Sequence, residues 1–169
     1  MQKVAVFGNA GGGKSTLSKR LAETTNLPLI VLDLVQYQPR GKKVTDEEYK
    51  TTHAEILQQD YWIIDGFGSL DTVWKRLEAA DTLVYIDLPV FQHYLWVTKR
   101  FIKGFWVAPE GYPENSPLLK STLNAYQVVW LCHKKLTPKY REYVEKVRDS
   151  KQVFHLKSTQ DIEQFWQTI

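Results

Sequence analysis

The chain has 169 residues and a formal net charge of +3, from 22 basic and 19 acidic side chains. This length suits one α/β domain with a sizeable core and is too short for two ordinary domains, so we expect a single domain over residues 1–169. No Lys/Arg block of the kind that follows a nucleic-acid backbone is present. Charge therefore does not indicate nucleic-acid binding, although a sequence pI near 8.8 leaves it open.

Apolar runs and the single cysteine bear on the compartment. No apolar run reaches membrane-spanning length, and the start of the chain lacks the basic, apolar and small-residue pattern of a secretory signal. Cys132 cannot form an internal disulfide, which is typical of a reducing compartment, and its helical surroundings favour a packed side chain over a nucleophile. We expect a soluble, cytoplasmic protein without membrane partners; its oligomeric state is not indicated.

The first predicted strand, residues 3–7, runs directly into a stretch from Gly8 to Ser15 with the spacing G-x-x-x-x-G-K-S. Glycines reach backbone angles closed to other residues, so consecutive N–H groups can turn toward an anion at a helix N-terminus. In this pattern Lys14 reaches the β and γ phosphates and Ser15 offers its hydroxyl to Mg²⁺. An amphipathic helical pattern follows, in which Thr16 could cap the helix or touch the α-phosphate. The sequence therefore predicts a nucleotide-binding P-loop.

A second short strand, residues 29–32, ends in Asp33, at the sheet edge where open α/β folds place their ligands. Asp33 could cap the next turn, but its place beside the P-loop favours a role toward a phosphoryl acceptor. Residues 34–44 are predicted to form a mobile polar loop. A capping box at residues 45–48 then begins a helix with Tyr49, His53 and Ile56 on one face, where His53 is interpreted as a half-buried helix residue and not a metal ligand.

Residues 61–66 predict a third strand that ends in Asp65, the form of a Walker B strand whose carboxylate faces Mg²⁺ or its water shell. The D-x-x-G pattern at residues 65–68 also fits GTPases, but no N-K-x-D motif follows to read guanine. A helix over residues 71–80 carries an apolar stripe that includes Val73, Trp74 and Leu77. This stripe leaves Lys75 and Arg76 available to solvent or substrate.

A fourth strand at residues 82–87 leads into a helix from residue 90 to about 103. Its basic last turn suits a helix C-terminus, and Arg100 or Lys99 could instead point back at a triphosphate. Residues 104–117, rich in Gly, Pro and aromatic side chains, are predicted to form a lid. On this helix the side chains expected to be buried are Phe91, Tyr94, Leu95 and Phe101, and the polar face comprises Gln92, Lys99, Arg100 and Lys103.

The rest of the chain predicts a helix over residues 118–136, a second helix from Thr137 to about residue 149, a strand at residues 152–156 and a closing helix at residues 159–168. Thr137 is predicted as an N-cap before Pro138 at the first helical position. The helix at residues 118–136 is expected to place Leu119, Leu123, Tyr126 and Trp130 on one face.

In their order these motifs resemble the adenylate kinase-like branch of P-loop kinases, and most nearly the proteins called DNA topology modulation protein, FlaR-related. The resemblance implies a P-loop NTPase three-layer α/β fold: a five-stranded parallel sheet in the order 2-3-1-4-5, with helices on both faces and a lid. It also implies ATP on the P-loop and an acceptor under the lid. The matching stretches are residues 7–15, 32–33, 62–66, 76–77, 80–81, 87–89, 99–100, 108–109 and 113–114.

Position by position, the resemblance implies that Asp65 holds the water shell of the metal and that Asp33 binds or deprotonates the acceptor. Arg100 would stabilise charge on the transferring phosphoryl group or stack on adenine, and Arg76 would meet an anionic acceptor. The residues expected to hold ATP and Mg²⁺ are Gly8, Gly11, Gly12, Gly13, Lys14, Ser15 and Thr16.

Two positions depart from the family pattern. Adenylate kinases have proline and arginine where this chain has Gly68 and Ser69, so an arginine contact to a nucleoside monophosphate is missing there. Residues 104–117 contain no Lys or Arg, whereas FlaR-like lids are arginine-rich, which puts efficient transfer in doubt.

We therefore expect an ATP-dependent kinase acting on a small acceptor, either a nucleotide or a hydroxylated metabolite. The alternatives are a nucleotide-binding regulatory protein linked to DNA topology or gene expression, without kinase activity, and a slow ATPase whose acceptor function has decayed.

Overall fold

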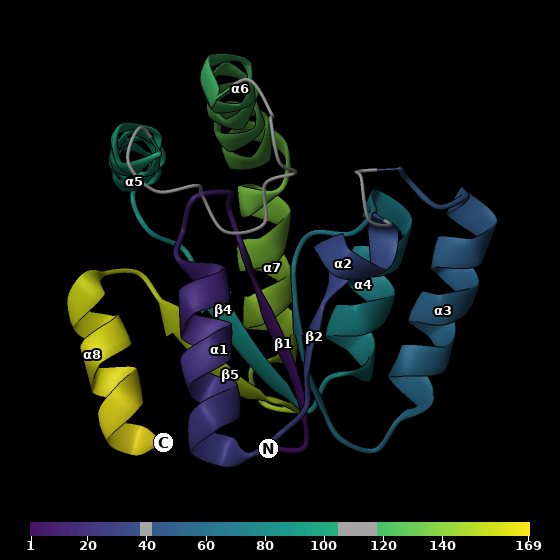
Figure 1. Cartoon of the computed structure of the whole chain (residues 1–169). Helices are drawn as coiled ribbons and strands as arrows, with labels where there is room; N and C mark the ends of the chain where they lie inside the picture. The colour runs from purple at the N-terminus through teal and green to yellow at the C-terminus, as the bar shows by residue number, and fades with distance from the viewer. Residues whose placement is uncertain (38–41, 105–117) are drawn as a thin grey trace.

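The computed structural model describes residues 1–37, 42–104 and 118–169, and its centre is a parallel β-sheet (Figure 1). The five strands within these ranges lie in the order β2-β3-β1-β4-β5, which confirms the predicted order. Because all of them run in the same direction, their carboxyl ends meet at one edge of the sheet. The strands are β1 (Lys3–Gly8), β2 (Leu29–Val31), β3 (Trp62–Asp65), β4 (Thr82–Ile86) and β5 (Gln152–Leu156).

Helices cover both faces of this sheet. On one face α1 (Lys14–Thr25) and α8 (Thr159–Thr168) pack on Val4, Ile63 and Val84. On the other face α3 (Asp46–Gln58), α4 (Leu70–Ala79) and α7 (Thr137–Val147) pack on a core that includes Phe7 and Tyr85. The central strands are buried on both sides, which explains their nearly continuous apolar sequence.

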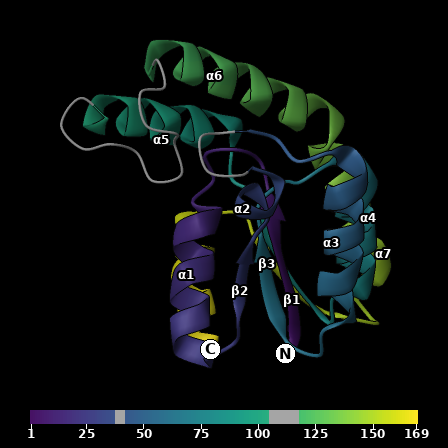
Figure 2. The same cartoon turned by 45° about the vertical axis from the view of Figure 1, so that its right-hand side comes forward.

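Two further helices, α5 (Val90–Lys103) and α6 (Leu118–Lys135), lie side by side beyond the carboxyl edge of the sheet (Figure 2). The predicted bounds of α5 are confirmed, but its predicted buried face is wrong: Phe91 and Leu95 are 58% and 53% exposed, whereas His93 and Val97 are buried. The prediction assumes that this helix packs on the sheet, whereas α5 packs on the loop between β1 and α1 and on α6.

The same correction applies to α6. Leu123 and Trp130, expected on its apolar face, are about half exposed, and the buried side chains include Val129 and Cys132. Cys132 is packed in the interior, as predicted, and burial raises the pKa of its thiol.

Strand β2 is shorter than predicted. It pairs with β3 only from Leu29 to Val31, and the chain then turns into the short helix α2 (Leu32–Gln36). Asp33 therefore lies in the first turn of a helix and not at the end of a strand, and residues 34–36 are helical instead of a mobile loop. Residues 38–41 of that predicted loop and residues 105–117 of the predicted lid lie outside the described residues.

The remaining predictions of bounds are close. β5 and α8 have the bounds expected, whereas α7 begins at Thr137 itself, with Leu136 in the N-cap position. Among the described helices, none has the length and apolar character needed to cross a bilayer.

Candidate active site

The loop between β1 and α1 has the backbone of an anion-binding turn. Gly11 and Gly13 have φ of 66° and 74°, in the left-handed region that favours glycine. Gly13 is the N-cap of α1 and no side chain caps this helix, whereas α3 and α8 begin with complete capping boxes. The first amides of α1 are thus left without a side-chain partner at the positive end of the helix dipole.

Helix α5 contacts this loop through three side chains, at i, i+3 and i+4, that lie on one face of the helix. A Cβ built on Gly11, Gly12 or Gly13 would come within 2.7 to 3.0 Å of a side chain of α5. The atoms met are Val97 Cγ2 for Gly11, His93 Cε1 for Gly12 and Trp96 Cζ3 for Gly13. The consecutive glycines are therefore needed for close packing as well as for backbone shape. Sequence analysis missed this role of α5, although bulky residues at i, i+3 and i+4 are the pattern that a row of glycines can accept.

Lys14 is folded onto its own loop. Its Nζ donates to the backbone oxygen of Asn9 at 2.7 Å. Burial lowers the pKa of the Lys14 ammonium, and the charges of Asp65 and Asp33 act in the opposite direction. Lys14 is thus held beside two carboxylates, in a position from which it can exchange Asn9 for a phosphate oxygen.

The two acidic residues predicted for the site are brought together by strand pairing. Val31 is the Cα partner of Asp65 in the parallel register, so Asp33, two residues later, lies next to the end of β3. Partial desolvation, and then the charge of Asp65, raise the pKa of the Asp33 carboxyl, even though the residue as a whole is exposed. A raised pKa is the direction expected of a group that accepts a proton from an acceptor hydroxyl.

Asp65 fits the predicted contact to a metal. It is 1% exposed, and its Oδ1 has no hydrogen-bond partner. Ser15, at the start of α1, is exposed. Within the described ranges no group of three or more His, Cys, Asp or Glu could hold a metal alone. This donor set suits Mg²⁺, which in phosphoryl-transfer sites takes one or two protein ligands and completes its shell with water and phosphate oxygens.

Arg76 corrects the sequence prediction of a solvent-accessible side chain. It is 1% exposed on the inner side of α4, its Nη1 donates to the Phe67 carbonyl at the long distance of 3.5 Å, and its Nε has no partner. Burial lowers the pKa of its guanidinium, while Tyr140, Tyr49, Asp65 and Asp33 favour the charged form. Arginine stays charged in proteins, so α4 holds a buried cation behind the two carboxylates.

The loop that follows β3 explains the departure at residue 68. Gly68 has φ of 67°, which proline cannot adopt, and a Cβ there would collide with the Tyr49 hydroxyl. Ser69 is the N-cap of α4, in a capping box with Thr72. The chain thus forms a tight turn here that packs against Tyr49 of α3.

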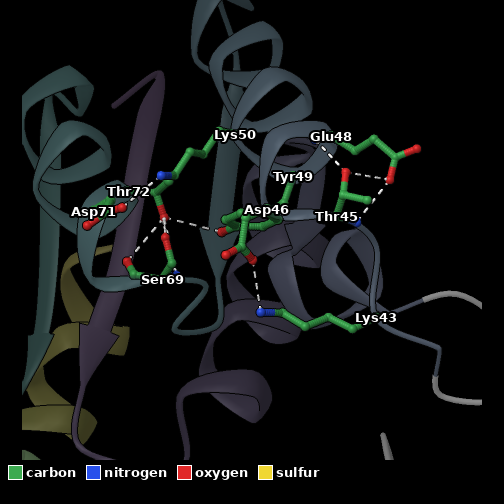
Figure 3. Close-up of polar contacts among 9 residues, drawn as sticks. All are labelled: Lys43, Thr45, Asp46, Glu48, Tyr49, Lys50, Ser69, Asp71 and Thr72. Atoms are coloured by element: carbon green, nitrogen blue, oxygen red, sulfur yellow. Dashed lines mark hydrogen bonds and ion pairs between the residues drawn. The ribbon is translucent and has the colours of Figure 1, made fainter.

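Helices α3 and α4 are tied together on this side of the site (Figure 3). The Tyr49 hydroxyl and the Thr72 hydroxyl are 3.3 Å apart, and Lys50 forms an ion pair with Asp71 at 2.9 Å. The predicted capping box of Thr45 and Glu48 begins α3. These contacts connect the two helices near their N-terminal ends.

A pocket of about 340 Å³ continues from the P-loop along α1. Trp96 of α5 and Trp166 of α8 contribute aromatic side chains to it, and the Arg20 guanidinium lies 4.2 Å from the centre of the Trp166 ring. Its size and aromatic lining suit a planar base. The lining residues are Gly12, Gly13, Thr16, Leu17, Arg20, Ile86, Trp96, Ile162 and Trp166.

A second pocket, of about 590 Å³, lies near the carboxyl ends of β4 and β5 beside an ion-pair network. Arg141 of α7 donates to both oxygens of Asp87, at 2.7 and 3.0 Å, and His155 Nε2 lies 2.9 Å from Oδ2. This network joins α7 to the ends of β4 and β5.

Of the predicted site residues, Lys14, Asp33, Asp65 and Arg76 interact electrostatically with one another. Gly8 is the last residue of β1, and Ser15 and Thr16 lie in the first turn of α1, as expected from their sequence positions. Arg100 is exposed in the last turn of α5, one turn beyond Trp96.

Comparison with solved structures identifies the fold. The chain is similar to an unliganded sugar kinase from Janibacter sp. HTCC2649, with a TM-score of 0.52 and 19% identity over 99% of this chain and 93% of that one. It is also similar to shikimate kinase from Bacteroides thetaiotaomicron, with a TM-score of 0.53 and 16% identity over 98% and 94% of the two chains. The chain has the P-loop NTPase fold of these kinases. No protein-family model and no curated protein matches the sequence, so the resemblance to FlaR-related proteins stays a prediction.

Proposed function

We propose that this protein is an ATP-dependent P-loop kinase that transfers the γ-phosphoryl group of Mg-ATP to a hydroxyl group of a small acceptor. The observation that carries the proposal is the electrostatic cluster of Lys14, Asp33, Asp65 and Arg76 at the uncapped start of α1. The two solved structures with this fold that are described above are a sugar kinase and a shikimate kinase.

Each residue of the cluster has a defined task in this proposal. The amides of residues 11–16 and the ammonium of Lys14 bind the phosphates, because both direct positive charge toward the N-terminus of α1. Ser15 and Asp65 hold Mg²⁺, Asp65 through water, and the bound ion supplies charge neutralisation on the phosphates. The pocket between Trp96 and Trp166 takes the adenine base.

Asp33 faces the acceptor. Its raised pKa suits a carboxylate that orients the acceptor hydroxyl and takes up its proton as the new bond to phosphorus forms. Arg76, buried behind it, acts on the site through its charge, which favours an acceptor that carries an anionic group. Arg100 would stabilise charge on the transferring group or stack on the base.

The test is to incubate the purified protein with Mg-ATP and a panel of nucleoside monophosphates and hydroxylated metabolites, and to measure ADP release above the rate without acceptor. We expect one acceptor class to stimulate release, and we expect Asp33→Asn to remove that stimulation by about 10²-fold or more while ATP still binds. Lys14→Ala should abolish ATP binding, and Lys139→Ala on α7 serves as the charge-matched control.

Three outcomes would contradict the proposal in different ways. Unchanged ATP affinity in Lys14→Ala would remove the P-loop argument. ATP binding with slow release and no stimulation by any acceptor would favour a slow ATPase. Tight DNA binding that survives physiological salt, without phosphoryl transfer, would favour the regulatory alternative.

A further inference from the structure

His93 on α5 has two hydrogen-bond partners of the same kind. Its ring is 1% exposed; Nδ1 lies 2.9 Å from the backbone oxygen of Ala10, and Nε2 lies 3.2 Å from the backbone oxygen of Leu88. A carbonyl oxygen only accepts, and a neutral imidazole carries a single N–H. Both contacts are therefore hydrogen bonds only when the ring is the doubly protonated imidazolium.

The two carbonyl oxygens belong to segments that must be held together for nucleotide binding. Ala10 is part of the P-loop, and Leu88 lies in the connection from β4 to α5. The ring between them also lies against Gly12, whose Cβ would come 3.0 Å from Cε1. His93 thus connects the segment before α5 to the loop that is expected to bind the phosphates.

The charges around His93 oppose each other. Burial lowers the pKa of the His93 imidazole in the nucleotide-free protein, and the Lys14 ammonium lowers it further. The two carbonyl contacts and the Asp87 carboxylate act in the opposite direction. Asp87 is itself paired with Arg141 and His155, which limits its effect on His93.

A bound nucleotide would change this balance. Its phosphates would face Lys14 and neutralise the cation that now disfavours a charged His93. The protonated ring would then be more stable in the complex than in the free protein. In a neutral ring one nitrogen carries no proton, so one of the two carbonyl oxygens faces a nitrogen that can only accept. This repulsion disfavours the contact between the P-loop and α5.

We infer that His93 is a positioning residue that takes up one proton from solvent when the anionic nucleotide binds, and that the resulting imidazolium holds the P-loop at Ala10 to the connection between β4 and α5 at Leu88. This inference rests on the proposed function, because it requires a nucleotide on the P-loop. By linkage, nucleotide affinity falls as pH rises through the pKa of His93 in the complex, because binding takes up a proton and the free proton concentration decreases with rising pH.

The test is isothermal titration of the wild-type protein with Mg-ADP near pH 7, in two buffers that differ in ionisation enthalpy. The difference in apparent heat reports the number of protons taken up. His93→Gln supplies amide N–H donors but cannot titrate. We expect this variant to take up fewer protons than wild type, with a difference of up to one proton per nucleotide bound. His133→Gln on α6 is the control and should match wild type. Equal proton uptake by wild type and His93→Gln would overturn the inference.

Nitrogen NMR of ¹⁵N-histidine in the wild-type protein tests the same point without depending on whether the variant folds. The chain has four histidines, so the ring signals can be assigned individually. We expect the His93 ring to be neutral in the free protein and protonated at both nitrogens in the Mg-ADP complex. A ring that stays neutral at saturation, or that is already charged without nucleotide, overturns the inference while nucleotide binding stands. Absence of any heat or spectral change on adding Mg-ADP would overturn the proposed function as well.

Discussion

Trp96 lies directly over Gly13, such that a Cβ on Gly13 would come within 3.0 Å of the indole Cζ3. Gly13 also has φ of 74° and forms the N-cap of α1. One residue therefore meets three demands at once: a left-handed backbone, close contact with α5 and an open helix N-terminus. This coincidence is the basis of the first prediction.

Gly13→Ala should destabilise the protein by about 2 to 4 kcal/mol, from left-handed strain and overpacking against Trp96. The stabilisation by Mg-ATP in a thermal melt should also be lost. Urea unfolding measures the first effect. Gly104→Ala is the control, since Gly104 has φ of −63° and alanine adopts that angle freely. A Gly13→Ala protein as stable as wild type, with full response to nucleotide, would show that α5 and the loop separate easily.

Asp65→Asn should remove much of the magnesium dependence of nucleotide binding. In wild type we expect tighter nucleotide binding with Mg²⁺ than with EDTA, because the buried Asp65 carboxylate orients the shell of the ion. The amide should lower the affinity of the nucleotide complex for Mg²⁺ by about 10- to 100-fold, as is typical of groups that hold a metal through its water. Titrating nucleotide at several Mg²⁺ concentrations measures this effect, and Asp71→Asn, on the exposed ion pair with Lys50, should leave it unchanged.

Arg76→Leu should impair function without lowering the stability of the fold. The guanidinium is buried with an incomplete set of hydrogen bonds, and replacing such a charge by an apolar side chain is often neutral or stabilising. We expect a free energy of unfolding equal to wild type or up to about 1 kcal/mol higher. Use of an anionic acceptor should be impaired in the same variant.

Urea unfolding and the KM for the acceptor are the two measurements for this variant. Lys75→Ala, at the exposed neighbouring position, is the control for both. A large loss of stability in Arg76→Leu would instead assign Arg76 a structural task in joining α4 to the loop at Phe67.

His53 should make the protein sensitive to acid. Desolvation, followed by the charge of Arg76, lowers the pKa of His53 to about 4 from the 6.5 of an unperturbed histidine. The neutral buried ring therefore contributes its full stability above about pH 6.5, and this contribution falls as pH decreases toward 4, because the unfolded chain binds the proton first.

Between pH 7.5 and 4.5, wild type should lose about 2 to 3 kcal/mol more stability than His53→Gln, which has no such group to titrate. Urea unfolding of both proteins at the two pH values gives the comparison. Parallel losses in both proteins would mean that His53 is protonated without cost in the folded state.

The amino-acid sequence indicated the parallel sheet and the glycine-rich loop that opens α1. The apolar strands ending in Gly8, Asp65 and Ile86 are short, buried on both faces and separated by helical patterns, so a parallel sheet could be predicted from them. The order of the strands was implied only by the resemblance to P-loop kinases. The capping box at Thr45 and the bounds of α5 were also predicted correctly, because they depend on residues close together in the chain.

Contacts between distant segments had to come from the tertiary structure. The packing of His93, Trp96 and Val97 against three glycines joins residues more than 60 positions apart, and the burial of Arg76 depends on how α4 is rotated. Phe91 and Leu95 look like core residues in sequence and are exposed, because α5 packs on a loop and a single helix instead of on a sheet. Local pattern specifies which segments become strands and helices, whereas the rotation of each helix and the charge around each buried group depend on what packs against it.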